Sequence, residues 1–189
     1  MTHGPHLGAE VTLDDPAFIH PTALIFGRVK IGRGASVWPY AVFRAEMFEI
    51  VVGERSNIQD FVMIHVGNRS PTIVGRDCSI THHATLHGCE IGDACLIGIG
   101  ATVMDGARIG ANSIVAGHSI VTEGSVFPEN SIIGGAPAKL IKSRDCGAAN
   151  RRNALFYHLN ALNYARGVER LQPADLERLR RAALDNGPT

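Results

Sequence analysis

The chain has 189 residues, with 18 basic and 18 acidic side chains, four cysteines and 21 glycines. This length fits one domain with a small appendage and excludes two full domains, while the balanced charge argues against nucleic acid or an anionic membrane as a partner. The cysteines show neither the two-residue spacing of a zinc ribbon nor a paired disulfide framework, so we interpret them as thiols, mostly buried.

The first 16 residues predict a flexible N-terminal tail. Residues 1–15 are polar and acidic and contain no apolar run, so we expect neither a signal peptide nor a membrane-spanning segment. A cytoplasmic location is therefore the default expectation.

From residue 17 to residue 142 the sequence repeats in units of six. The units IGDACL, IGIGAT, VMDGAR, IGANSI, VAGHSI and VTEGSV run without interruption from Ile91 to Val126. The same phase appears upstream at Ile19, Ile25, Ile31, Val37 and Phe43. A unit of this length suits a short strand followed by a corner, and three such units make one triangular coil. The repeat therefore predicts a mainly β domain, a single-stranded left-handed parallel β-helix whose leading aliphatic side chains point inward.

Two other folds fit the repeat less well. Glycines at this density would cost a helix interior about 1 kcal/mol each. A β-sandwich needs alternation with a period of two and turns every eight to twelve residues or so. The pattern shows neither of these features.

The six-residue phase is broken twice. It shifts by three between Phe43 and Val52 and is restored at Ile73. We expect loops at residues 45–49 and 66–72, because departures from a solenoid repeat map to loops, often on the functional face.

Residues 143–189 predict a C-terminal helical segment. Leu155, Leu159 and Leu162 have helical spacing within residues 148–166, and Pro173 is a favourable first residue for a second helix. We expect this segment to pack on the solenoid and cover exposed backbone.

Three of the nine histidines, His65, His82 and His87, lie at or near the breaks in the repeat. Three neutral imidazoles with one open coordination position form a catalytic zinc set, with His83 and His118 as competing ligands. His82 and His87 are five residues apart, so they should leave the solenoid on adjacent faces, and a symmetric oligomer would let His82 of one chain meet His87 of another. The alternative is a set of solvated histidines on a solenoid wall, which the spacing alone slightly favours.

Several longer motifs carry a family resemblance that extends from Ile19 to Lys142. They are FRAE, VGERSNIQDFVMIH, ITHHATLHGC, IGIGATVMDGARIG and IGGAPAKLIK. Together they resemble the gamma-class carbonic anhydrase family. The resemblance implies a homotrimer that reversibly hydrates carbon dioxide to bicarbonate, using a metal-bound hydroxide at the subunit interface. Zinc is the expected metal, with iron or cobalt as other candidates.

The resemblance also implies roles for individual residues. His65 and His87 of one subunit and His82 of its neighbour would bind the metal. Arg44 would pair across the interface with Asp60.

Further residues are implied as catalytic. Gln59 would lie near the metal-bound water, and Tyr164, like Tyr157, resembles a tyrosine that relatives place near the cleft. Glu46 stands where the family usually has an aspartate, so the carboxylate that helps to orient the site is one methylene longer. Glu46 and His83 are the candidate proton-transfer groups.

Two other functions stay open. IGGAPAKLIK is shared with hexapeptide acyltransferases, which transfer an acyl group from a thioester donor, but that function would leave Gln59, His65, His82 and His87 without a joint explanation. The other is a noncatalytic trimeric metal-binding scaffold, since a fold does not establish a function.

Overall fold

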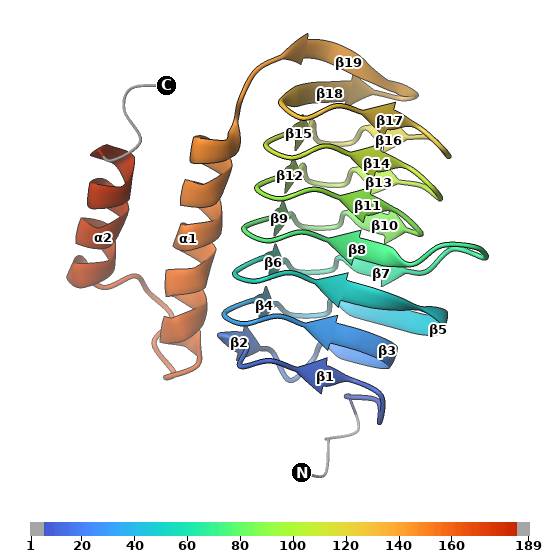
Figure 1. Cartoon of the computed structure of the whole chain (residues 1–189). Helices are drawn as coiled ribbons and strands as arrows, with labels where there is room; N and C mark the ends of the chain where they lie inside the picture. The colour runs from blue at the N-terminus through green and yellow to red at the C-terminus, as the bar shows by residue number, and fades with distance from the viewer. Residues whose placement is uncertain (1–5, 185–189) are drawn as a thin grey trace.

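The computed structural model describes residues 6–184 and shows a solenoid of about seven coils with two helices beside it (Figure 1). The predicted fold class, a left-handed parallel β-helix with a C-terminal helical segment, is confirmed. Residues 1–5 of the expected tail and residues 185–189 lie outside the described part. Residues 12 and 13, also assigned to the tail, form a short strand parallel to Lys30 and Ile31.

The coils form a prism with three faces. Face A carries β7 (Met63–His65), β10 (Thr85–His87), β13 (Thr102–Val103) and β16 (Ile120–Val121). Face B carries β1 (Thr12–Leu13), β8 (Thr72–Val74), β11 (Glu90–Ile91), β14 (Arg108–Ile109) and β17 (Val126–Phe127). Face C carries β2 (Phe18–Ile19), β4 (Ser36–Val37), β6 (Asn57–Ile58), β9 (Ser79–Ile80), β12 (Leu96–Ile97), β15 (Ile114–Val115), β18 (Ser131–Gly135) and β19 (Ala138–Ser143). Two long strands, β3 (Leu24–Ile31) and β5 (Val42–Val52), run from face A to face B.

The leading residues of the six-residue units form the core, as predicted. Strands of neighbouring coils pair parallel and in register, so that Ile91 lies beside Ile109 and Ile97 beside Val115. All four side chains are at most 2 % exposed. Each such side chain contributes about 1.5–3 kcal/mol by leaving water.

Both breaks in the repeat are present in the structure. Three extra residues enter β5 opposite the register shift between Gly27 and Val29 of β3. They remain part of β5, so the interruption expected at residues 45–49 is a bulge within a strand and not a separate loop; residues 46–49 have no register partner in β3, β7 or β8. The second expected loop is confirmed between β7 and β8.

Two helices follow the solenoid, as predicted. α1 (Gly147–Tyr164) packs on face C against β2, β4, β6 and β9, and α2 (Pro173–Leu184) packs on α1 (Figure 1). Within residues 6–184, no helix combines the length and the apolar character that crossing a membrane requires.

The last coil ends in a hairpin. β19 turns back and pairs antiparallel with β18, which places Lys139 beside Gly134 and Lys142 beside Ile132. The pair of β18 and β19 is antiparallel, whereas the other strand pairs of the eight-stranded sheet are parallel.

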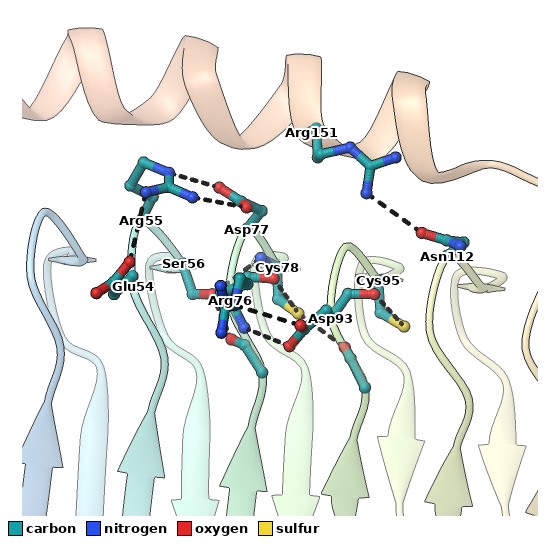
Figure 2. Close-up of polar contacts among 12 residues, drawn as sticks. Glu54, Arg55, Ser56, Arg76, Asp77, Cys78, Asp93, Cys95, Asn112 and Arg151 are labelled. Carbon is teal, nitrogen blue, oxygen red and sulfur yellow. Dashed lines mark hydrogen bonds and ion pairs between the residues drawn. The ribbon is translucent and has the colours of Figure 1, made fainter.

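The corner between faces B and C carries polar contacts beneath α1 (Figure 2). Arg55 binds Asp77 of the next coil through two hydrogen bonds of 2.8 and 2.9 Å, and Arg76 lies 3.3 Å from Asp93. Arg151 of α1 donates a hydrogen bond to Asn112 at this corner. These contacts join one coil to the next and join α1 to the solenoid.

The four cysteines are buried free thiols, as expected. Cys78 and Cys95 occupy equivalent positions in successive coils, and each donates a hydrogen bond to a backbone carbonyl of the next coil, at Gly92 and Gly110. Burial raises the pKa of Cys95 to about 12 and that of Cys78 further in the same direction. Burial also raises the pKa of Cys89 to about 12.

These thiols predict a loss of stability at alkaline pH. Unfolded thiols ionise near their ordinary pKa of 9.0 while folded ones keep their protons, so the unfolded state loses protons first. The free energy of unfolding should therefore fall as the pH rises from about 9 to about 12, by up to about 1.4 kcal/mol per pH unit for each thiol. Urea unfolding at a series of alkaline pH values measures this slope. Cys78→Ser with Cys95→Ser should reduce it, and an unchanged slope would contradict the assignment.

Candidate functional site

Two of the three predicted ligands lie side by side on face A. His65 of β7 and His87 of β10 are register partners, and Arg44 of β5 is the register partner of His65 on its other side. His65 Nδ1 lies 3.0 Å from His87 Nε2. Asp105, which follows β13, places its Oδ2 2.7 Å from His87 Nδ1. These four residues, Arg44, His65, His87 and Asp105, form one line of polar contacts across the coils, which we call the histidine row.

Glu46 and Arg44 meet the outer side of His65. Its Nε2 lies 3.0 Å from Glu46 Oε2 and 3.2 Å from Arg44 Nη2, and the two charged side chains are 3.3 Å apart. Desolvation alone would raise the pKa of Glu46, but hydrogen bonds from its own backbone and His65, with the charges of Arg44 and His65, lower it below its usual value. The carboxylate therefore stays ionised and accepts a hydrogen bond from the His65 ring.

His82 lies apart from this row. It sits at the corner between faces C and A, where its Nδ1 is 3.0 Å from Asp60 Oδ2 and its Nε2 is 3.5 Å from the Tyr157 hydroxyl. Across residues 6–184, no group of three His, Cys, Asp or Glu side chains from one chain could hold a metal ion. A single protomer therefore brings together two of the predicted ligands and leaves the third at another corner.

The predicted catalytic residues Gln59 and Tyr164 lie outside the histidine row. Gln59 is 1 % exposed and donates a hydrogen bond of 2.9 Å to Asn57 Oδ1. The ring of Tyr164 packs edge-on against Trp38 and Phe18, with centroids 5.1 and 5.9 Å apart. Tyr157, seven residues earlier on the same face of α1, is the tyrosine whose hydroxyl faces a predicted ligand, His82.

The resemblance implies that Arg44 of one protomer pairs with Asp60 of another. Within a single protomer, each of the two residues has a different partner. Arg44 contacts Glu46 and His65, and Asp60 contacts His82. Asp60 and His82 belong to neighbouring coils of one corner, just as Arg44 and His65 are register partners on one face.

Asp105 is a site residue that the sequence analysis missed. It lines, together with His87 and the loop between β7 and β8, an open cavity of about 440 Å³. The signal was available, because VMDGAR is the unit that places Val103 beside Leu86, one residue before His87. This register places Asp105 one coil from His87, and the direction of its side chain at the corner then brings the two together.

Comparisons with known proteins show which family the chain resembles. A family model described as bacterial transferase hexapeptide (six repeats) matches residues 88–123. The crystal structure of a hexapeptide transferase family protein from Anaplasma phagocytophilum is 31 % identical, with a TM-score of 0.73, and the match covers 85 % of this chain and 95 % of that one.

Among curated proteins, the chain is similar to gamma carbonic anhydrase 3, mitochondrial, of Arabidopsis thaliana, at 45 % identity over 159 residues and 81 % of this chain. It is also similar to the carnitine operon protein CaiE of Escherichia coli O157:H7, at 39 % identity over 67 % of this chain and 65 % of that protein. The matches to Arabidopsis gamma carbonic anhydrases 1, 2 and 3 span 36 %, 49 % and 60 % of those proteins.

The position of Tyr164 predicts a packing contribution. Tyr164→Phe keeps the ring and should change the free energy of unfolding by less than about 0.5 kcal/mol, whereas Tyr164→Ala removes the contacts with Trp38 and Phe18 and should cost about 2–4 kcal/mol. Denaturant unfolding of both variants measures the difference. A loss of catalytic activity in Tyr164→Phe at unchanged stability would instead assign a catalytic role to the hydroxyl.

Proposed function

This chain belongs to the hexapeptide-repeat family and is gamma carbonic anhydrase-like, and we propose that it reversibly hydrates carbon dioxide to bicarbonate at zinc sites shared between the protomers of a homotrimer. The observation that carries the proposal is the placement of the three histidines. His65 and His87 lie together on face A, and His82 lies at a corner that only another protomer can bring to them.

The spacing of the first two ligands fits one zinc ion. Two nitrogens bound to a tetrahedral zinc at about 2.0–2.1 Å lie about 3.3 Å apart. His65 Nδ1 and His87 Nε2 are 3.0 Å apart, so a small separation of the rings would accommodate the ion. A third nitrogen from the neighbour's His82 would leave the fourth position for water or substrate.

Carboxylates would fix the orientation of each imidazole. Asp105 would accept a hydrogen bond from Nδ1–H of His87, and Asp60 one from Nδ1–H of His82, so both rings would present Nε2 as the metal ligand. Glu46 would accept a hydrogen bond from Nε2–H of His65, which leaves Nδ1 of that ring for the metal. Three acidic side chains thus prepare three ligands.

One arrangement of two protomers would satisfy every predicted contact between them. His82 and Asp60 lie one above the other at the corner, 3.0 Å apart. Arg44 and His65 lie one above the other on face A. A corner that brings His82 to His65 and His87 therefore also brings Asp60 toward Arg44, as the resemblance implies.

A zinc ion at this position would lower the pKa of a coordinated water from about 15.7 to about 7 and so supply the nucleophile for carbon dioxide. The chain's own side chains hold the ligands and move protons. Glu46, ionised and half-exposed, is the nearest candidate for carrying a proton to solvent. Gln59 donates a hydrogen bond to Asn57 and directly precedes Asp60. Its role would be to hold the corner that presents His82.

Metal content separates this proposal from the alternatives. An acyltransferase would contain little metal, and a scaffold would contain metal without hydration activity. The plant relatives are named as mitochondrial proteins, and the cytoplasmic location expected for this chain stays a prediction.

The shared site predicts complementation between inactive variants. His82→Ala and His87→Ala should each lose the metal, since each removes one ligand from every site. When the two variants are co-expressed in equal amounts, about one quarter of the sites should combine an intact His65 and His87 from one chain with His82 from the other. Zinc analysis and stopped-flow carbon dioxide hydration should recover that fraction, and His158→Ala, which alters a histidine of α1 that contacts the Gly34 carbonyl, is the control that keeps the metal. Full metal content in either single variant would contradict the assignment.

The carboxylates predict a second measurable effect. Asp105→Asn and Asp60→Asn should each weaken zinc binding by about 10–100-fold, because the amide no longer accepts the Nδ1 proton as a charged group does. Competition with a chromophoric chelator measures the affinity without reference to activity. Asp93→Asn, which alters an acidic residue at the corner beneath α1, is the matched control and should bind zinc normally.

A further inference from the structure

The three corners of the prism differ in chemistry. The corner between faces B and C is polar and lies beneath α1 (Figure 2). The corner between faces A and B is formed in the upper coils by glycines, Gly88, Gly106 and Gly124. The corner between faces C and A carries exposed aromatic rings, and we call these the aromatic column: Tyr40, Phe61, His83 and His118.

The rings of the aromatic column stack on one another. Tyr40 and Phe61 have ring centroids 5.1 Å apart at 15°, and Phe61 and His83 are 4.9 Å apart at 1°. A Cβ atom at Gly100, the next corner position, would lie 2.6 Å from the ring of His118, so that ring occupies the space above the glycine. Three rings therefore stack in three successive coils, and His118 covers the glycine position that follows them.

The backbone at these positions disfavours large side chains. Tyr40, Phe61, His83 and His118 have φ values of 60°, 59°, 59° and 56°. Left-handed backbone of this kind suits glycine or asparagine and costs other residues about 1 kcal/mol or more. Yet Tyr40 and Phe61 are 55 % and 51 % exposed, so burial within the chain does not offset that cost.

Face A carries a set of apolar side chains beside the column. Leu24, Val42 and Met63 are register partners in three successive coils; Leu24 is 41 % exposed, and Val42 and Met63 are partly exposed. We call these three residues the apolar row. Phe26, which is 39 % exposed, is the register partner of Arg44 and extends the line of Arg44, His65 and His87 by one coil. The apolar row lies between the aromatic column and that line.

We propose that the aromatic column of one protomer packs on the apolar row of the next copy of this chain, and that this contact holds the trimer together independently of the metal. The inference rests on the proposed function, which requires His82 of a neighbour to approach His65 and His87. His82 directly precedes His83 of the column, and the strand that ends at His65 begins with Met63 of the row. An approach that delivers the ligand therefore brings the two apolar surfaces together.

The contact joins two different surfaces of the same chain. A heterologous interface of this kind closes into a ring when the rotation between copies is one third of a turn. Burial of the aromatic rings would offset the backbone cost at the corner, because a buried aromatic side chain is among the largest apolar contributions to an interface.

The double variant Tyr40→Asn, Phe61→Gly tests the proposal. Both replacements suit left-handed backbone, so the solenoid should keep its circular dichroism spectrum and its melting temperature at high protein concentration. We expect the dissociation constant of the trimer to rise about tenfold or more, measured by sedimentation over a dilution series. Phe156→Ala, which removes an exposed aromatic side chain from α1, is the matched control and should assemble normally.

The outcomes separate this inference from the metal site. Wild-type protein stripped of metal by a chelator, and His82→Ala, should both remain trimeric. A double variant that dissociates no more readily than wild type would overturn the inference even where zinc binds as proposed. If the double variant does not fold, Phe61→Gly alone gives the same reading. A wild-type chain that is monomeric at high concentration would overturn both proposals, whereas a trimer without metal that dissociates in the double variant would overturn the metal site alone.

Discussion

Hydrogen bonding between successive coils is the constraint on which the structure depends. Parallel strands pair in register, so residues one coil apart lie side by side and point the same way. A residue type that recurs at that interval becomes a column, whether it points inward, as Phe43 and Ile64 do, or outward, as Arg44 and His65 do. The solenoid thus turns sequence spacing directly into spatial order. Core, polar corner, histidine row and aromatic column are four results of one rule.

The rule also allows different residues to serve one role. Ser56, Cys78, Cys95 and Ser113 each donate from the side chain to a carbonyl of the next coil. A hydroxyl and a thiol differ in strength as donors and in acidity, but both fit the narrow corner. The carboxylates of the site are equivalent in the same sense, since Asp60 and Asp105 hold Nδ1 of different imidazoles from different corners.

How far the sequence determines this structure follows from the same rule. The leading Ile and Val residues predicted the inward side chains because a strict repeat leaves one way to stack them. The breaks predicted where extra residues enter, but not that the first insertion stays extended as a bulge within β5. The spacing of His82 and His87 predicted that they leave the solenoid in different directions around a corner. Asp105 was missed because a pairing between corner side chains depends on their directions, which a repeat does not specify. Tyr157 and Tyr164 share one face of α1 and both pack on Trp38. Tyr157 rather than Tyr164 reaches His82 because it lies two turns earlier along the helix, whereas Tyr164 lies beside Phe18 of the first coils.

The hairpin at the last coil limits the length of the solenoid. A stack of parallel strands presents open backbone groups at its end, where a further coil from any molecule could add and begin a fibre. β19 runs in the opposite direction to the strands below it and carries Lys139 and Lys142, so an incoming parallel strand meets the wrong polarity and two positive charges. Addition of another parallel coil on face C is therefore disfavoured at this end of the solenoid. The direction of one six-residue strand thus closes the sheet of face C where the repeat ends.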